Sequence, residues 1–175
     1  SRQLTITNNE RAVFTSIMLC FLTIITKLYA ATGIRSTPAM LYLGCPVWAN
    51  AQWKNALYAA DAKAADFLSV YSRYFNSAEG NTTFYADPTP DTLRRWQQHS
   101  AADFRFMLKV PQRISHQSPN DCQIALKDWL DLLSHLAGKL ALVHLQLPAF
   151  FSPEHLSWLK QMLNTLCSSF SVAVE

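Results

Sequence analysis

The sequence is poor in charge and lacks closely spaced cysteines, and each shortage excludes a class of protein. Charged residues make up 15% of the 175 residues, below the roughly 25% that is usual in soluble domains. The net charge is +3, but Lys and Arg are scattered, so no nucleic-acid-binding patch is predicted. The four cysteines, Cys20, Cys45, Cys122 and Cys167, show no C-x-x-C spacing. This argues against a zinc site and a disulfide framework, and favours reduced thiols in the cytoplasm.

Residues 1–39 differ in composition from residues 40–175. The segment 12–31 is almost wholly apolar or hydroxylic, and Lys27 is the one charge inside it. Three interpretations are open: a signal peptide or signal anchor, a helix packed on the domain, or an extension outside the natural domain. We favour the third, in which the extension is an over-extended reading frame or a cloning remnant. The natural domain then begins at Met40, directly before the first predicted strand, and no membrane span is expected in it.

From Met40 onward, strand-like apolar runs alternate with amphipathic runs of helical period. The predicted strands are 41–45, 75–79, 104–110, 140–147 and 171–174, and the predicted helices are 62–74, one from Pro90 with Thr89 as its N-cap, 121–137, and one from Ser152. Strands that alternate with helices predict a parallel sheet. The strands start about 32 residues apart, and eight such units approach the ~250 residues of a TIM barrel.

An open doubly wound sheet is the main rival to the barrel. Such sheets usually carry a glycine-rich first turn, but Gly44-Cys45-Pro46 holds one glycine, so the dinucleotide-binding pattern is missing. We therefore predict an α/β fold, a (β/α)8 TIM barrel truncated here to about the first four βα units plus strand five.

Polar side chains stand at the carboxyl ends of the predicted strands, where TIM barrels hold their active sites. Strand by strand these are Glu79, Lys109 with His116 in the following loop, Gln146, and Glu175. Polar groups in such positions are costly unless they are hydrogen-bonded or used. The pattern predicts one shared pocket at the barrel mouth.

The candidate catalytic residues are Glu79, Lys109, His116 and Glu175. Carboxylates suit general acid–base chemistry, Lys109 suits anion binding, and His116 suits either task. Structural explanations stay open, since Glu79 could simply neutralise Lys109 and His116 could be a solvated loop residue. The candidate substrate-binding residues are Trp48, Asn81, Thr83, Tyr85 and Gln146.

Two histidines receive different interpretations. His144 lies inside the fourth predicted strand and is interpreted as a core or sheet-face residue. No metal ligands are assigned, because no H-x-H or H-x-x-H spacing occurs. A divalent metal held by Glu79, Glu175 and His116 is kept as an alternative.

Several of these motifs together resemble the DUF72 (YecE-like) family of TIM-barrel proteins. The matching pieces are 43–48, the E-x-N-x-T-F-Y element at 79–85 with its preceding strand and Pro88, Trp96, 104–106 with Lys109 and Pro111, 114–116, the Q-L-P element at 146–148, and 173–175. The resemblance covers 41–175 and not 1–39. It implies an eight-stranded barrel and no firmly established activity. In the family, an arginine–histidine segment and three more strands would follow Glu175.

The sequence thus predicts a hydrolase or phosphodiesterase-like enzyme that acts on a small polar or phosphorylated substrate at the barrel mouth. The alternatives are a non-catalytic protein that binds an anion or nucleotide there, and an inactive truncated fragment. The expected partner is a small molecule, and no oligomeric state is assigned.

Overall fold

A computed structural model of the chain describes residues 41–116, 122–136 and 138–175. Five parallel strands form one sheet, and their order in the sheet, β1-β2-β3-β4-β5, is their order along the chain. The strands are β1 Gly44–Cys45, β2 Ser77–Gly80, β3 Arg105–Lys109, β4 Leu140–Leu145 and β5 Val172–Val174. The prediction of a parallel α/β sheet is confirmed. The order lacks the reversal of a doubly wound sheet, and within the described ranges the sheet is open, with β1 and β5 at its edges.

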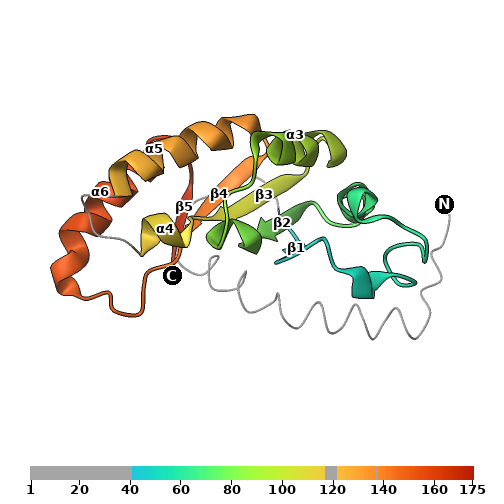
Figure 1. Cartoon of the computed structure of the whole chain (residues 1–175), viewed down its shortest axis with the longest axis horizontal. Coiled ribbons are helices and arrows are strands. Elements are labelled where there is room, and N and C mark those ends of the chain that lie inside the picture. The colour runs from blue at the N-terminus through green and yellow to red at the C-terminus, as the bar shows by residue number, and fades with distance from the viewer. Residues whose placement is uncertain (1–40, 117–121, 137) are drawn as a thin grey trace.

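The helices lie in the connections between strands. They are η1 Ala51–Trp53, η2 Ala64–Asp66, α2 Phe67–Tyr71, η3 Asn81–Phe84, α3 Pro90–His99, α4 Gln112–Ser115, α5 Cys122–Leu133, η4 Ser134–Leu136, η5 Pro153–His155 and α6 Leu156–Cys167. Figure 1 shows α3, α5 and α6 arranged along one side of the sheet. None of the helices in the described ranges has the length and apolarity that a membrane crossing requires. The predicted extension 1–39 lies outside the described residues.

Burial alternates along the strands and separates the two faces of the sheet. In β3, Phe106 and Leu108 are fully buried, whereas Met107 and Lys109 between and after them are partly buried. Successive side chains of a strand point to opposite faces, so the buried set packs under the helices. The stripe Leu126, Trp129, Leu133 and Leu136 of α5 and η4 joins this core. The opposite face, which we call the open face, carries the other set.

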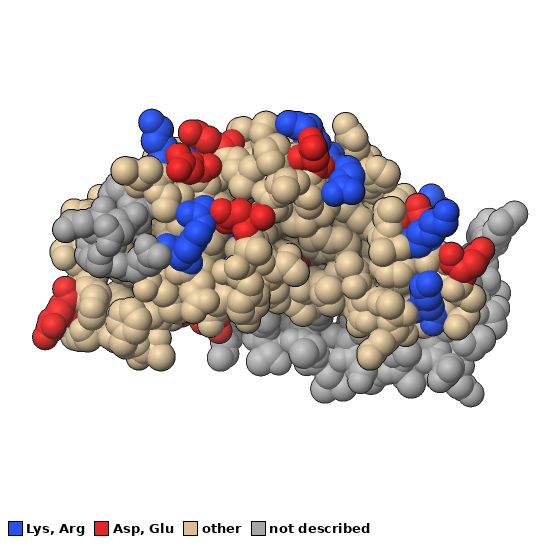
Figure 2. Space-filling view, viewed as in Figure 1, with Lys and Arg blue, Asp and Glu red and all other residues tan. Residues whose placement is uncertain are grey.

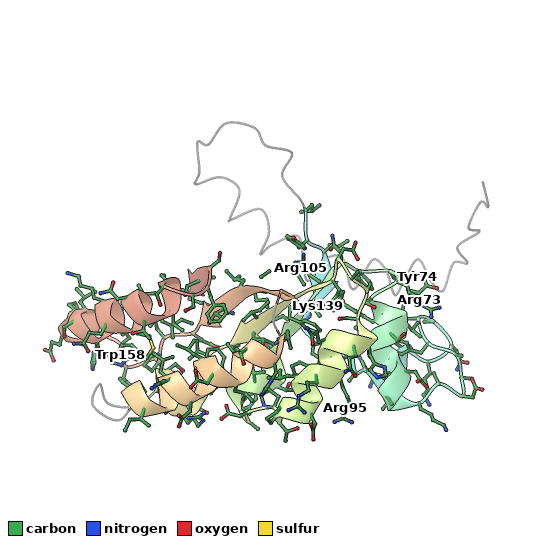
Figure 3. All side chains as sticks on the ribbon, turned by 90° about the horizontal axis from the view of Figure 1, so that it is seen from above. Arg73, Tyr74, Arg95, Arg105, Lys139 and Trp158 are labelled. Carbon is green, nitrogen blue, oxygen red and sulfur yellow. The ribbon has the colours of Figure 1, made fainter. Side chains whose placement is uncertain are left out.

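Lys139 fastens the end of α3 to the start of β4. Its Nζ donates to the backbone oxygens of Gln97, Ser100 and Ala101 at 2.7, 2.9 and 3.0 Å, and to Ser100 Oγ at 2.8 Å. Three N–H groups serve these four oxygens, so one is shared. Burial, and then the charge of Arg105, lower the pKa of Lys139. Figure 3 shows Lys139 and Arg105 near one another where β3 and β4 begin. The cation also suits the negative end of the α3 dipole.

Replacing Lys139 by Met is expected to lower the free energy of unfolding by about 2–3 kcal/mol. The change keeps the apolar stem but removes charge-assisted hydrogen bonds, which contribute about 1.5–3 kcal/mol each, and it leaves helix-end carbonyls without donors. The matched control is Lys160→Met on the exposed side of α6, for which we expect a change within about 0.5 kcal/mol. Urea denaturation compares the two, and equal midpoints for both variants would contradict the proposed fastening.

Candidate functional site

Polar side chains of the open face form one connected group at the carboxyl ends of the strands. Glu79 lies near the end of β2, Lys109 ends β3, His144 lies in β4, and Gln146 and Glu175 follow β4 and β5. The Nζ of Lys109 donates to Oε1 of Gln146 at 3.0 Å and lies 3.9 Å from Oε1 of Glu79. We call these five residues the strand-end cluster. The structure therefore places Glu79, Lys109, Gln146 and Glu175 in one group with His144.

His144 lies between the two carboxylates of this cluster. Its Nδ1 is 3.6 Å from Oε1 of Glu79, and its Nε2 is 3.2 Å from Oε2 of Glu175. An ionised carboxylate only accepts hydrogen bonds, so a hydrogen bond to either carboxylate would use a proton on the ring nitrogen that faces it. The ring thus lies within ion-pair distance of both carboxyl groups. An imidazole in this position can take up a proton at one nitrogen and release one from the other.

The cluster has a buried part and a solvent-facing part. The side chains of Glu79, Lys109 and His144 are 11%, 17% and 16% exposed, whereas that of Glu175 is 67% exposed. Strand register explains the proximity, because Lys109 is paired with His144 across β3 and β4. Removing several neighbouring ionisable groups from water costs free energy unless ion pairs or hydrogen bonds between them offset the lost hydration. Here each partly buried member has a partner of opposite charge or a hydrogen-bond partner.

His144 is the site residue that sequence reasoning did not select. We interpreted it as a core or sheet-face residue because it lies inside a strand. It does lie on a sheet face, but that face is the open one, and its ring joins the cluster. The spacing of two residues between His144 and Gln146 was the available indication, since such residues share a face of a strand.

His116 lies beside the cluster and is not part of it. Its Nδ1 is 2.9 Å from Oγ of Ser115, and its ring stands edge-on to that of Phe84 with centroids 5.5 Å apart. Burial lowers the pKa of His116, which favours the neutral ring. No hydrogen bond or ion pair in the described part of the chain joins it to Glu79 or Glu175. Phe84 connects the two regions, because its ring centroid lies 6.0 Å from Nζ of Lys109.

Thr83 and Asn81, which we predicted to bind substrate, hold the strand ends together. The hydroxyl of Thr83 is buried and lies 2.8 Å from the backbone oxygens of both Gly80 and Lys109, which share its single proton. The amide of Asn81 donates to the backbone oxygen of Pro46 at 3.3 Å. These bonds tie the chain after β2 to the ends of β3 and β1. Their polar groups thus fix the positions of the strand ends that carry the cluster.

The two predicted aromatic contacts have different positions. Trp48 is 9% exposed and packs edge-on against Trp96 and Phe106, with centroids 4.9 and 5.7 Å away. Phe106 belongs to the helix-covered face, so Trp48 is a core residue, and its position does not support the predicted stacking on substrate. Tyr85 is 81% exposed and stands edge-on to Phe84 at 5.1 Å. It stays a candidate for contact with a ligand.

Metal-ligating side chains do not gather in the described ranges. These ranges contain no group of three or more His, Cys, Asp or Glu side chains placed to hold a metal ion. The alternative set of Glu79, Glu175 and His116 is not brought together, because His116 lies beyond Phe84.

The chain matches one protein family over most of its length. The model of the family described as "Protein of unknown function DUF72" matches residues 42–175. The UPF0759 protein YecE of Escherichia coli strain K12 is 37% identical over 137 residues, which are 78% of this chain and 48% of that protein, and the same values hold for YecE of E. coli O157:H7. The chain spans about half the length of these curated relatives.

Solved structures of DUF72 family proteins share the fold. A crystal structure from Thermotoga maritima matches with a TM-score of 0.61 at 21% identity, covering 78% of this chain and 56% of that one. A crystal structure from Enterococcus faecalis matches with a TM-score of 0.63 at 19% identity, covering 77% of this chain and 50% of that one.

Proposed function

The chain belongs to the DUF72 family of proteins of unknown function, and we propose from its strand-end cluster that it acts as a hydrolase. The substrate would be a small polar or phosphorylated molecule, as for a phosphodiesterase-like enzyme, bound at the mouth of a (β/α)8 barrel. In this proposal, the five strands described above are the first part of that barrel. The sequential strand order and the polar groups at strand carboxyl ends support it, because TIM-barrel enzymes place their active sites there.

The observation that carries the proposal is the position of His144 between Glu79 and Glu175. In a hydrolysis, Glu79 accepts a proton from water while the water oxygen bonds to the electrophilic atom of the substrate. The bond to the leaving oxygen breaks, and that oxygen keeps the electron pair and takes a proton from Glu175. Glu79 then moves from 3.6 Å to hydrogen-bond distance of Nδ1 of His144 and passes its proton to it, and Nε2 passes a proton to Glu175. To complete the cycle, Nδ1 releases its proton to water that enters after the product leaves, Nε2 takes a proton from Glu175, and Glu175 takes one from solvent, so the ring regains its original tautomer.

Lys109 and Gln146 have an orienting task in this scheme. The ammonium of Lys109 lies between Oε1 of Gln146 and Oε1 of Glu79, so it fixes the carboxylate against the strand ends. A protein that only bound a ligand would need no proton path between two carboxyl groups. The arrangement therefore favours the enzyme over the binding protein.

Replacing His144 by Gln is expected to lower the turnover number about 10²–10⁴-fold, since glutamine keeps hydrogen-bonding atoms but transfers no protons. The assay measures release of p-nitrophenol from a panel of p-nitrophenyl phosphates, acetate and glycosides. His99→Gln on the exposed side of α3 is the matched control and should retain the activity of the unchanged protein. Equal turnover by the two variants would rule out the proton path. An unchanged protein that binds panel members but hydrolyses none would be a binding protein.

A further inference from the structure

We infer that the substrate of the strand-end cluster is a neutral, hydroxyl-bearing molecule of the glycoside class, and not a phosphorylated one. The inference rests on the hydrolase activity proposed above and specifies its substrate. Three observations support it: the charge balance of the cluster, its hydrogen-bonding atoms, and the rings beside it.

The charge balance disfavours an anionic substrate. The cluster holds two carboxyl groups, of which Glu79 is the ionised base and Glu175 the proton donor in the proposed reaction, and Lys109 is its one permanent cation. That ammonium already lies against Oε1 of Gln146 and Oε1 of Glu79. A phosphate group would add negative charge beside the ionised Glu79 in a partly dehydrated site, where like charges repel strongly. A neutral substrate meets no such repulsion.

The connections after β2, β3 and β4 bring no spare cation. In the segments 81–89, 110–121 and 146–155, Arg113 is the single Lys or Arg. Its guanidinium is paired with Asp87, with Nε 2.9 Å from Oδ2. Positive and negative side chains are also mixed elsewhere on the surface. On the face that Figure 2 draws, most Lys and Arg side chains lie beside an Asp or Glu side chain. Phosphate sites normally rely on Arg forks, lysines or glycine-rich loops, and these segments supply none of them.

The atoms that the cluster offers to a ligand match hydroxyl groups. Glu175 is largely exposed and presents acceptor oxygens. Gln146 uses its Oε1 for Lys109, and no described hydrogen bond uses its amide hydrogens, so these can donate to a ligand. A sugar hydroxyl both donates and accepts, and therefore suits a site that pairs a carboxylate with an amide.

An aromatic group borders the cluster. The ring of Phe84 lies near Nζ of Lys109, and the rings of Tyr85 and His116 stand edge-on to Phe84. Tyr85 exposes 81% of its surface. A pyranose has an apolar face of C–H groups and a polar rim of hydroxyls, so it can rest on exposed ring surface while its rim reaches the cluster. Ligand sites commonly combine aromatic walls with a few polar groups in this way.

On a glycoside, the electrophilic atom is the anomeric carbon. The oxygen of water bonds to this carbon, Glu79 takes one proton of the water, and the bond from the carbon to the leaving oxygen breaks. The leaving oxygen keeps the bonding electrons and takes the proton of Glu175. The products are a free sugar and an alcohol, no oxidant or reductant takes part, and two carboxyl groups suffice, as in other glycoside hydrolysis.

The test compares substrates that share one leaving group. Initial rates are measured with p-nitrophenyl α- and β-glycosides of several hexoses, with p-nitrophenyl phosphate, and with bis(p-nitrophenyl) phosphate. We expect kcat/KM for at least one glycoside to exceed that for both phosphates by tenfold or more. Tyr85→Ala should raise KM for that glycoside about fivefold, an effect of the size of a ring contact near 1 kcal/mol. The matched control Ile124→Ala, at an exposed apolar residue of α5, should leave KM unchanged.

Two results would overturn the inference in distinguishable ways. Faster hydrolysis of either phosphate ester than of every glycoside would reject the neutral substrate and leave the proposed hydrolase standing. Absence of p-nitrophenol release from all compounds, with p-nitrophenyl acetate included, would reject the hydrolase itself and the substrate class with it.

Discussion

A Glu79→Gln variant is expected to lose about 10²–10⁴-fold in turnover number while it stays folded. Glutamine has nearly the size of glutamate and can still accept the contact from Lys109, but its amide takes no proton from water or from His144. Because the change removes a step of the reaction and not a binding contact, KM should change little. The measurement is kcat and KM for the best substrate of the p-nitrophenyl panel, with thermal unfolding of both proteins.

Asp87→Asn is the matched control for this variant. Asp87 is also a carboxylate in the connection after β2, but it pairs with Arg113 on the surface. It should keep nearly full turnover. If Glu79→Gln lowers stability and leaves turnover unchanged, Glu79 has the structural role of neutralising Lys109, which was the alternative explanation of this residue.

A Gly44→Ala variant is expected to lose about 3 kcal/mol or more of its free energy of unfolding. A Cβ at position 44 would lie 1.7 Å from the backbone oxygen of Ser77 and 2.4 Å from its carbonyl carbon. Backbone atoms of a paired strand cannot move aside as a side chain does, so β1 would have to separate from β2. The pairing of Cys45 with Ala78 and the hydrogen bond from Cys45 N to the hydroxyl of Tyr71 would be lost as well.

Gly80→Ala provides the comparison on the neighbouring strand. There the nearest atom to an added Cβ is Cδ2 of Leu108 at 2.6 Å, the end of a flexible side chain. The expected loss is about 1 kcal/mol, the cost of modest overpacking. Urea denaturation followed by tryptophan fluorescence measures both variants. Equal losses of stability in the two variants would contradict the idea that the close approach of the β1 and β2 backbones excludes a side chain at position 44.

The sequence predicted the order and type of the main elements because their determinants are local. Thr89 accepts a hydrogen bond from the backbone of Thr92 at 3.1 Å and Pro90 begins α3, as its N-cap pattern indicated. The fourth helix likewise begins after Ser152, in a capping box with His155. Apolar runs placed β3 and β4 within one or two residues. The 62–74 helix was less successful, since the structure shortens it to η2 and α2.

The composition of the site was harder to predict because it depends on which face of the sheet the helices cover. A strand pattern shows alternation but not the side to which each set points, so the sequence leaves His144 as a core or sheet-face residue and does not select it for the site. Trp48 differs in the other direction: the sequence makes it a candidate for substrate binding, but in the structure it packs into the core, as an aromatic residue just after a strand can do. For Thr83, the buried backbone oxygens that need its hydroxyl become visible only once β2 and β3 are paired.

The sequential order of the sheet also bears on how the protein is made. Each described strand after β1 pairs with the strand that precedes it in the chain. During synthesis, each new strand can therefore add to an edge that already exists. The loop that each pairing closes is no longer than one βα unit, which keeps its entropy cost low. Glu79 and Lys109 then meet first, His144 joins them with β4, and Glu175 arrives with β5. A nascent chain halted on the ribosome before β5 would therefore carry an imidazole that still lacks its second carboxylate.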